Sequence, residues 1–295
     1  MIIVIGEVLM DMFPDHSVVG GAAFNVAFHL QKLGLPVRFL SRVGDDRHGR
    51  RIMSVLKTNG VDAANIQIDK RHPTGTVRVT LDAQGVPRFE ICTDVAYDYI
   101  DLGKEVMRDT SAVEMVYFGS LVQRTARACQ HLQAWLDGFS DRVTRYCDIN
   151  LRPPHIHSGA VTGCLQRADL FKLSEEELIA LQGIFKGPVD GDAWVFELMA
   201  RYNLHAVALT RGRQGGSFYH CGSRRDVPAV GVPAMVDTVG AGDGFSAVLM
   251  AGYARQKPWP EVLRQASRFA SRICSIPGAV PDGDDEYADL RQWFG

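Results

Sequence analysis

A glycine-rich turn near the carboxyl end of the chain carries a single carboxylate. The turn consists of Gly240, Ala241 and Gly242. Asp243 follows it, and the apolar run FSAVLMAG predicts a helix that begins here. Unpaired N–H groups at a helix N-terminus bind anions such as phosphate. A carboxylate there would repel the phosphate, so its position needs an explanation. It has one if the carboxylate acts on the attacking hydroxyl group, as the base of a phosphoryl transferase does. The alternative is that Asp243 only caps the helix.

Two other glycine-rich motifs are excluded at this turn. A dinucleotide-binding fingerprint requires glycine at its first, third and sixth positions, and the sixth position counted from Gly240 is Phe245. A Walker A loop requires Gly-x-x-x-x-Gly-Lys followed by Ser or Thr, and the sequence contains no such run. The turn is therefore predicted to be an anion hole of backbone N–H groups, in which the helix dipole favours an ionised Asp243.

A second pair of glycines opens another predicted helix, in the segment GGAAFNVAFHLQKLG. Gly20 and Gly21 precede the helix, which is predicted from Ala22 onward by an apolar arc at helical spacing. Asn25 lies one turn further, on the polar remainder of the helix. Backbone without side chains allows a ligand to approach a helix start closely. Asn25 thus belongs either to a ligand site or to a solvated helix face.

Strand-like apolar runs alternate with amphipathic stretches, which is the pattern of an α/β protein. The predicted strands cover residues 2–10, 37–44, 115–121, 145–150, 169–174 and 205–210. Several are apolar on both faces, as central parallel strands are. The helices between them include 46–58, which ends at Asn59-Gly60, and 128–139.

One segment breaks this alternation. Residues 74–94 alternate with a period of two around Gln84-Gly85, which predicts a β-hairpin with a solvated face. A hairpin inserted early in an α/β chain predicts a small second sheet, set against the main body and acting as a lid.

Composition limits the partners and the compartment. The 295 residues carry a net charge of −2, so neither nucleic acid nor an anionic membrane is expected as a partner. No apolar run reaches the roughly 18 residues that span a bilayer. The N-terminus lacks a basic region and a cleavage site, which predicts a buried strand and a cytoplasmic protein. The six cysteines show no paired spacing, and His155-x-His157 has no nearby partners, which argues against disulfides and a metal site.

The two glycine motifs, in this order, resemble the signatures of the ribokinase-like (PfkB-type) carbohydrate kinases. The resemblance extends through GEVLMDMFPD, PTGTVRVTL, DINLRPP, FKLSEEEL and PGAVP, and so covers essentially the whole chain. Within the family, GEVLMDMF, VAYDYI and DINLRPP are most similar to the fructokinases. The resemblance implies a single domain over residues 1–295, with a central, mainly parallel sheet flanked by helices on both faces. It also implies a β lid formed by about residues 11–20 and 74–95.

The activity implied by the resemblance is transfer of the γ-phosphate of ATP to a primary hydroxyl of a sugar, with fructose as the first expectation. 2-Keto-3-deoxygluconate, a pentose or a nucleoside are the alternatives within the family. An inactive sugar-binding protein is an alternative of another class, but an intact Asp243 argues against it. The missing sixth-place glycine argues against an NAD-dependent oxidoreductase. The implied cofactor is Mg²⁺, with K⁺ as a further candidate near Asp237 and residues 277–280, and the implied assembly is a homodimer through the β lid.

By the same resemblance, one group of residues would bind the sugar. Asp11 and Asn25 would hydrogen-bond to its hydroxyl groups, and together a carboxylate and an amide select a vicinal diol. Gly20 and Gly21 would let the sugar lie against the backbone. Arg152 would bind the sugar or the phosphates. The alternatives are a water-facing charge at a strand end for Asp11 and a surface salt bridge for Arg152.

A second group would bind the nucleotide and the metal. The residues implied for the nucleotide are Lys172, Ser174, Thr210, Gly212, Gly215 and Ser267. Ser174 stands in place of the Asn in the family's Asn-x-x-Glu element, and Ser267 in place of a frequent Asn near the adenine. Glu177 would act on Mg²⁺ through water, which suits an ion that retains its hydration. The alternative for Glu177 is an acidic helix N-terminus stabilised by the helix dipole.

Overall fold

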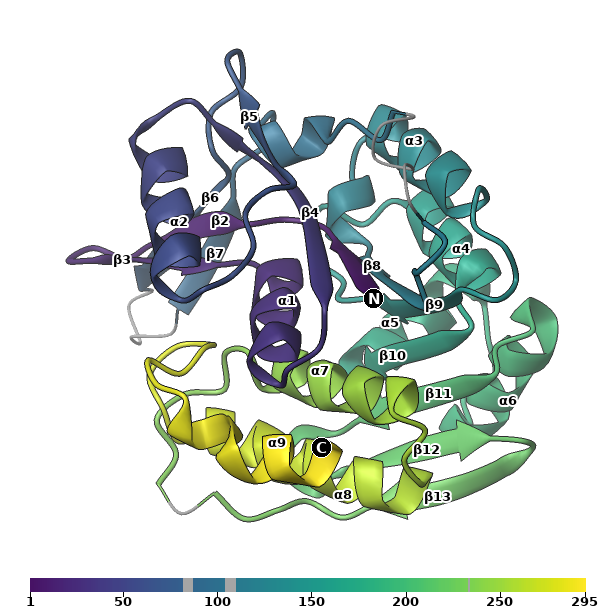
Figure 1. Ribbon diagram of the computed structural model, residues 1–295. Coiled ribbons are helices and arrows are strands. Elements are labelled where there is room, and N and C mark those ends of the chain that lie inside the picture. The colour runs from purple at the N-terminus through teal and green to yellow at the C-terminus, as the bar shows by residue number, and fades with distance from the viewer. Residues whose placement is uncertain (82–86, 104–109, 233) are drawn as a thin grey trace.

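Two β-sheets of unequal size organise the chain (Figure 1). The computed structural model describes residues 1–81, 87–103, 110–232 and 234–295. Within these residues the large sheet has nine strands, in the spatial order β13 (Ser223–Val227), β12 (Gly216–His220), β11 (Ala206–Thr210), β10 (Leu170–Ser174), β9 (Thr144–Asp148), β8 (Met115–Gly119), β1 (Ile2–Ile5), β4 (Val37–Gly44) and β5 (Ile66–Asp69). The small sheet has the order β3 (Ser17–Gly20), β2 (Leu9–Met12), β6 (Thr76–Leu81) and β7 (Pro87–Ile91).

The large sheet is mainly parallel and is covered on both faces. Neighbouring strands from β5 to β11 pair in parallel, and β12 and β13 extend the sheet with antiparallel pairs. Ile2 and Val4 of β1 pack into one hydrophobic core, whereas Ile3 and Ile5 pack into the other. Because successive side chains of a strand point to opposite faces, an apolar strand of this kind needs helices on both sides.

The helices divide between these two cores. One core contains side chains from α1 (Ala22–Lys32), α2 (Arg47–Thr58), α7 (Ala241–Ala254), α8 (Trp259–Ile273) and α9 (Ala288–Phe294). The other contains side chains from α3 (Ala126–Leu136), α4 (Ser158–Arg167), α5 (Glu175–Phe185) and α6 (Gly191–Tyr202). Helices α1 and α7 lie side by side, so the two glycine-rich motifs meet in space (Figure 1). In the described residues, no helix is both long and apolar enough to cross a membrane.

The structure confirms the predicted fold class and most predicted elements. Helix α1 starts at Ala22 as expected, and α2 begins after the capping residue Asp46. The second small sheet is present, although the predicted turn at Gln84-Gly85 lies outside the described residues. The prediction of one strand over residues 2–10 is wrong. The chain leaves the large sheet after β1 and enters the small sheet as β2, and at Gly6 a side chain would overlap Ala23.

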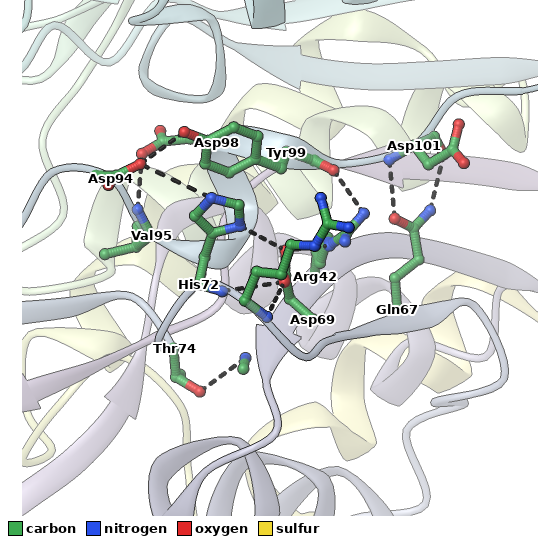
Figure 2. Close-up of polar contacts among 12 residues, drawn as sticks. Arg42, Gln67, Asp69, His72, Thr74, Asp94, Val95, Asp98, Tyr99 and Asp101 are labelled. Atoms are coloured by element: carbon green, nitrogen blue, oxygen red, sulfur yellow. Dashed lines mark hydrogen bonds and ion pairs between the residues drawn. The ribbon is translucent and has the colours of Figure 1, made fainter.

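The segment from β5 to β6 leads the chain from the large sheet to the small one, and Asp69 fixes its start. This residue ends β5 and is almost fully buried. Its carboxylate accepts hydrogen bonds from the backbone N–H groups of Arg71 (2.7 Å) and His72 (3.0 Å), as Figure 2 shows for His72. The same carboxylate lies 2.8 Å from Nε of Arg42 on β4. The turn toward the small sheet is therefore anchored to the large sheet by one buried charge.

The segment that follows β7 packs against the segment between β5 and β6 through two stacked rings. His72 and Tyr99 stack with their centroids 3.7 Å apart (Figure 2). The Tyr99 hydroxyl donates to Asp94 (2.6 Å), and Nη1 of Arg42 donates to the Tyr99 carbonyl (2.8 Å). Both connections of the β6–β7 hairpin are thus tied to β4.

We predict that Asp69→Asn destabilises the fold. Burial by itself raises the pKa of Asp69, but the N–H groups of Arg71 and His72 and the guanidinium of Arg42 outweigh burial and hold it well below its ordinary value. Breaking such a buried pair should lower the free energy of unfolding by about 2–4 kcal/mol near neutral pH. Because the native pKa is lowered, this contribution is present above the unfolded-state pKa of about 4 and is lost as the pH falls below it.

Urea unfolding of both proteins at neutral and at acidic pH measures this effect. The difference between them should shrink in acid. Asp15→Asn, which removes an exposed carboxylate beside His16, is the control and should leave the unfolding midpoint unchanged. Equal midpoints for Asp69→Asn and the native protein at neutral pH would contradict the anchoring role.

Candidate active site

Asp243 lies in the first turn of α7, but it does not cap that helix. The N-cap is Gly240, which has φ = +76° and makes no side-chain capping bond. A side chain at Gly240 would overlap Ala279, so the turn requires glycine there. The Asp243 Oδ2 accepts a hydrogen bond of 2.7 Å from Nδ2 of Asn25 on α1. The interpretation of Asp243 as a helix cap is therefore wrong.

The Asn25–Asp243 pair places an unsatisfied acceptor beside a carboxylate. Asn25 is 4% exposed, and its Oδ1 has no hydrogen-bond partner among the described residues. Burial raises the pKa of Asp243, whereas the Asn25 hydrogen bond and the charges of Lys172 and Arg152 lower it. Burial thus opposes the helix dipole, which alone predicted a fully ionised group. A buried amide oxygen without a partner is costly, so it is a natural acceptor for a ligand hydroxyl.

Asp11 faces the same region from the small sheet. It lies on β2, and a side chain at Gly20 would overlap its Oδ2, so the glycine makes room for this carboxylate. Burial raises the pKa of Asp11 to about 6, although the positive charge of Arg152 opposes the shift. Asp11 is half-buried against Gly20, which disagrees with the freely solvated charge of the alternative interpretation.

Glu7 is a buried carboxylate that the sequence analysis missed. Its Oε1 accepts a hydrogen bond of 3.0 Å from the backbone N–H of Ala22, at the N-terminus of α1. Burial raises its pKa, and its own backbone, the Ala22 N–H group and Arg152 oppose the shift. Gly21 has φ = +114°, and a Cβ there would lie 2.7 Å from the Glu7 carbonyl oxygen. Glu7 is the only charge in the first apolar run, which is the signal that could have identified it.

Arg152 follows β9 on an exposed segment, and its charge acts on three carboxyl groups. Its charge lowers the pKa values of Glu7, Asp11 and Asp243. It forms none of the ion pairs found within the described residues, so a surface salt bridge does not explain it. Asn25 therefore contacts Asp243 directly, and Arg152 acts on both Asp243 and Asp11.

A cleft of about 760 Å³ opens on the other side of the α7 N-terminus. Its walls include every residue predicted to bind the nucleotide, namely Lys172, Ser174, Thr210, Gly212, Gly215 and Ser267. Ala241 and Gly242 also line it, whereas Phe245 and Leu263 give it an apolar wall. A cleft with apolar walls and a few polar groups at one end suits a nucleotide base with its phosphates.

Lys172 joins this cleft to the anion hole. Its side chain is 9% exposed, and its Nζ would lie 3.0 Å from a Cβ at Gly242. Burial by itself lowers the lysine pKa, but the charges of Asp148, Glu177 and Asp243 outweigh burial and raise it. A protonated ammonium group therefore lies directly beneath the glycine-rich turn.

Glu177 forms a capping box with Ser174. The Glu177 N–H donates to Ser174 Oγ (3.2 Å), and the Ser174 N–H donates to Glu177 Oε2 (2.7 Å). The other oxygen, Oε1, accepts from the N–H of Leu151 (2.7 Å). The alternative of an acidic helix N-terminus thus describes the local structure correctly. Each oxygen retains a lone pair, so a water-mediated metal contact is compatible with this arrangement.

Asp237 connects the turn before α7 to residues 277–280, the two segments where the resemblance places a monovalent cation. Its Oδ1 accepts from the N–H of Val239 (2.7 Å), and its Oδ2 accepts from the N–H of Gly278 (2.9 Å). Asp237 therefore holds residues 277–280 next to the α7 turn.

Comparison with known proteins identifies the family. A sequence profile of the pfkB family carbohydrate kinases matches residues 5–285. Fructokinase-2 of Solanum habrochaites is 30% identical over 95% of this chain and 92% of its own length. Probable fructokinase-5 of Arabidopsis thaliana is 28% identical over 95% of this chain and 93% of its own.

A solved structure agrees with these sequences over the whole fold. It is an uncharacterized sugar kinase from Pyrococcus horikoshii in complex with ATP, with a TM-score of 0.82 and 25% identity, over 98% of this chain and 100% of that one. The profile matches residues 5–285, and the fold agrees with that of a sugar kinase. The chain therefore belongs to the pfkB family of carbohydrate kinases.

Proposed function

We propose that the protein transfers the γ-phosphoryl group of ATP to a primary hydroxyl group of fructose. The observation that carries this proposal is the position of the α7 N-terminus between two sites. Asp243 contacts Asn25 on the side where Asp11 and Arg152 gather, while Gly242 lines the cleft suited to a nucleotide. Acceptor and donor would therefore meet at this turn.

The geometry supports a positioning mechanism. Asp243 would orient the attacking hydroxyl group in line with the phosphoryl group and accept its proton late, because the transition state of phosphoryl transfer is loose. The N–H groups of Gly240, Ala241 and Gly242 would stabilise the charge on the transferring group. Lys172 would add a positive charge from below the same turn.

Fructose is favoured as the acceptor by the relatives. Curated relatives named fructokinase are 27–30% identical, and their alignments cover 85–99% of this chain. In the site, Asp11 and the free Oδ1 of Asn25 supply acceptors, and Arg152 supplies donors for hydroxyl groups. The predicted alternatives, 2-keto-3-deoxygluconate, a pentose or a nucleoside, become outcomes of a substrate assay.

Mg²⁺ would be held mainly by the phosphates of ATP. Within the described residues there is no group of three or more His, Cys, Asp or Glu side chains that could by itself hold a metal ion. Glu177 fits a contact through water, because each of its oxygens accepts only one backbone hydrogen bond. The ion would supply charge neutralisation on the phosphates. K⁺ would lie near Asp237 and residues 277–280.

The remaining expectations concern architecture and location. We propose that residues 1–295 form one kinase domain and that the small sheet acts both as a lid over the sugar and as the surface of a homodimer. The connections at His72 and Tyr99 hold both ends of the β6–β7 hairpin to β4, so a closing movement would take place relative to these two anchors. The cytoplasmic location stays a prediction from the sequence.

A substrate panel tests the proposed function. Purified protein with ATP and Mg²⁺ should release ADP with fructose, at a higher kcat/KM than with 2-keto-3-deoxygluconate, ribose or adenosine. A coupled ADP assay measures this, and thermal shift with ATP–Mg²⁺ against NAD is a control, because only a bound ligand stabilises the fold. A preference for another acceptor would replace fructose, and no ADP release with any acceptor would refute the kinase.

Asp243→Asn should abolish most turnover while both substrates still bind. Asparagine keeps the size of the side chain and an acceptor for Asn25, but it cannot take the proton, so kcat should fall roughly 10²- to 10⁴-fold. Steady-state kinetics and calorimetric binding of ATP and fructose measure the two effects. Turnover near that of the native enzyme would rule out Asp243 as the base, and a lowered melting temperature would assign the loss to unfolding.

The pH dependence of the reaction should report Asp11. Its pKa of about 6 means that the carboxyl group becomes protonated as the pH falls through 6 and ceases to be a pure acceptor. The kcat/KM for fructose should then decrease toward acid with an apparent pKa of about 6. In Asp11→Asn this decrease toward acid should be absent, and kcat/KM at neutral pH should be lower than in the native enzyme. An unchanged decrease in the variant would assign it to another group.

A further inference from the structure

Asp148 is a fully buried carboxylate to which the proposed reaction gives no role. It ends β9, and both of its oxygens lie 3.1 Å from Nζ of Lys172 on β10. Its Oδ2 also accepts a hydrogen bond of 2.9 Å from Oγ of Ser246 on α7. One carboxylate therefore connects two parallel strands to the helix that carries Asp243.

The position of Lys172 gives this connection a chemical consequence. Its Nζ would lie 3.0 Å from a Cβ at Gly242, so the ammonium group occupies the space that this glycine leaves open. Lys172 and Gly242 both line the cleft. A small shift of the lysine or of the first turn of α7 would change the distance between the ammonium group and the phosphate that the turn would bind.

An ammonium group in this position needs an ionised partner. Desolvation disfavours a buried charge, and a lysine without a partner loses its proton at a lower pH or moves toward water. Three carboxylates from three elements act on Lys172, namely Asp148 on β9, Glu177 on α5 and Asp243 on α7. Of these, Asp148 is the one with a hydrogen bond to Nζ. Glu177 is bound to backbone N–H groups, and Asp243 to Asn25.

We propose that Asp148 is a positioning residue for phosphoryl transfer, which holds the Lys172 ammonium group beneath Gly242 and, through Ser246, fixes the first turn of α7 above it. The inference rests on the proposed function and adds to it a residue that acts through Lys172 and Ser246. Asp148 itself contacts neither substrate, because Lys172 and Ser246 occupy its oxygens.

A second ion pair between the same two strands supplies a matched control. Asp169 immediately precedes β10, and its Oδ2 accepts a hydrogen bond from the N–H of Arg145 on β9 (2.6 Å) and lies 3.9 Å from the Arg145 Nη1. This pair lies at the opposite end of the strands and does not line the cleft. Asp169→Asn therefore weakens the connection of β9 to β10 without altering the charge at Lys172.

The test compares Asp148→Asn, Asp169→Asn and the double variant Asp148→Asn/Lys172→Arg in kcat and KM from about pH 6 to about pH 10. In Asp148→Asn we expect kcat to fall about 100-fold at neutral pH, while the KM for fructose stays within about twofold. A basic limb should also appear below about pH 10, because Lys172 loses its partner and then its proton. In the double variant the limb should be absent, because arginine does not titrate in this range. Asp169→Asn should keep the native pH profile.

Ser246→Ala keeps the test decisive if Asp148→Asn does not fold. This variant retains the Asp148–Lys172 pair and removes only the bond to α7, so kcat should fall about 3- to 10-fold with no new basic limb. Native kcat in Ser246→Ala would overturn the role assigned to the α7 connection. Native kcat and pH profile in folded Asp148→Asn would overturn the inference as a whole.

ADP release by the native enzyme distinguishes failure of the role proposed for Asp148 from failure of the proposed function. If native protein releases no ADP with fructose or any other acceptor, the kinase proposal fails. If it releases ADP and folded Asp148→Asn behaves like it, only the role of Asp148 fails. A melting temperature that falls equally in Asp148→Asn and Asp169→Asn, with unchanged kinetics in both, would show a structural role alone.

Discussion

Charges withdrawn from water at the carboxyl edge of the large sheet must find partners within the protein. Glu7, Asp148 and Lys172 all lie at this edge with less than a tenth of their surface exposed. Ionised groups remain in such a place only when hydrogen bonds and opposite charges replace water. The N-terminus of α1 meets this requirement for Glu7, which accepts from the N–H of Ala22, and Asp148 and Lys172 meet it for each other. The site therefore arises from the need to satisfy buried charge.

The glycines at both helix starts follow from the same crowding. A side chain at Gly20 would displace the Asp11 carboxylate, one at Gly21 would meet the Glu7 backbone, and one at Gly242 would meet the Lys172 ammonium group. The sequence analysis attributed Gly20 and Gly21 to the close approach of a ligand. The protein's own backbone already requires Gly21, and Gly20 makes room for Asp11, so the presence of these glycines alone does not demonstrate a ligand. The unsatisfied Oδ1 of Asn25 is the stronger indication of one.

Local sequence patterns predicted the elements whose formation depends on residues close together in the chain. Apolar runs and helix starts gave the parallel sheet, α1 and α2, and a period of two gave the β6–β7 hairpin. The strand β13 was missed because its sequence, SRRDV, lacks the alternation of a half-buried strand. The division of residues 2–10 between two sheets was also missed, because both parts are apolar and only Gly6 marks the break. Asp148 was missed as a functional residue because its partners, Lys172 and Ser246, lie on other elements.

Helix α7 is the element through which the two halves of the site act on each other. Its first turn presents Asp243 toward Asn25 on α1 and lines the cleft with Ala241 and Gly242, and one turn later Ser246 binds Asp148. Because Asn25 on α1 is hydrogen-bonded to Asp243 in this turn, a nucleotide that displaced the turn would also act on Asn25. The small sheet carries Asp11 on β2, and its β6–β7 hairpin is anchored at Asp69 and Tyr99. Acceptor and donor thus meet on a rigid element, and the small sheet that would close over the acceptor continues through Gly21 into α1, so its closure would act directly on the helix that carries Asn25.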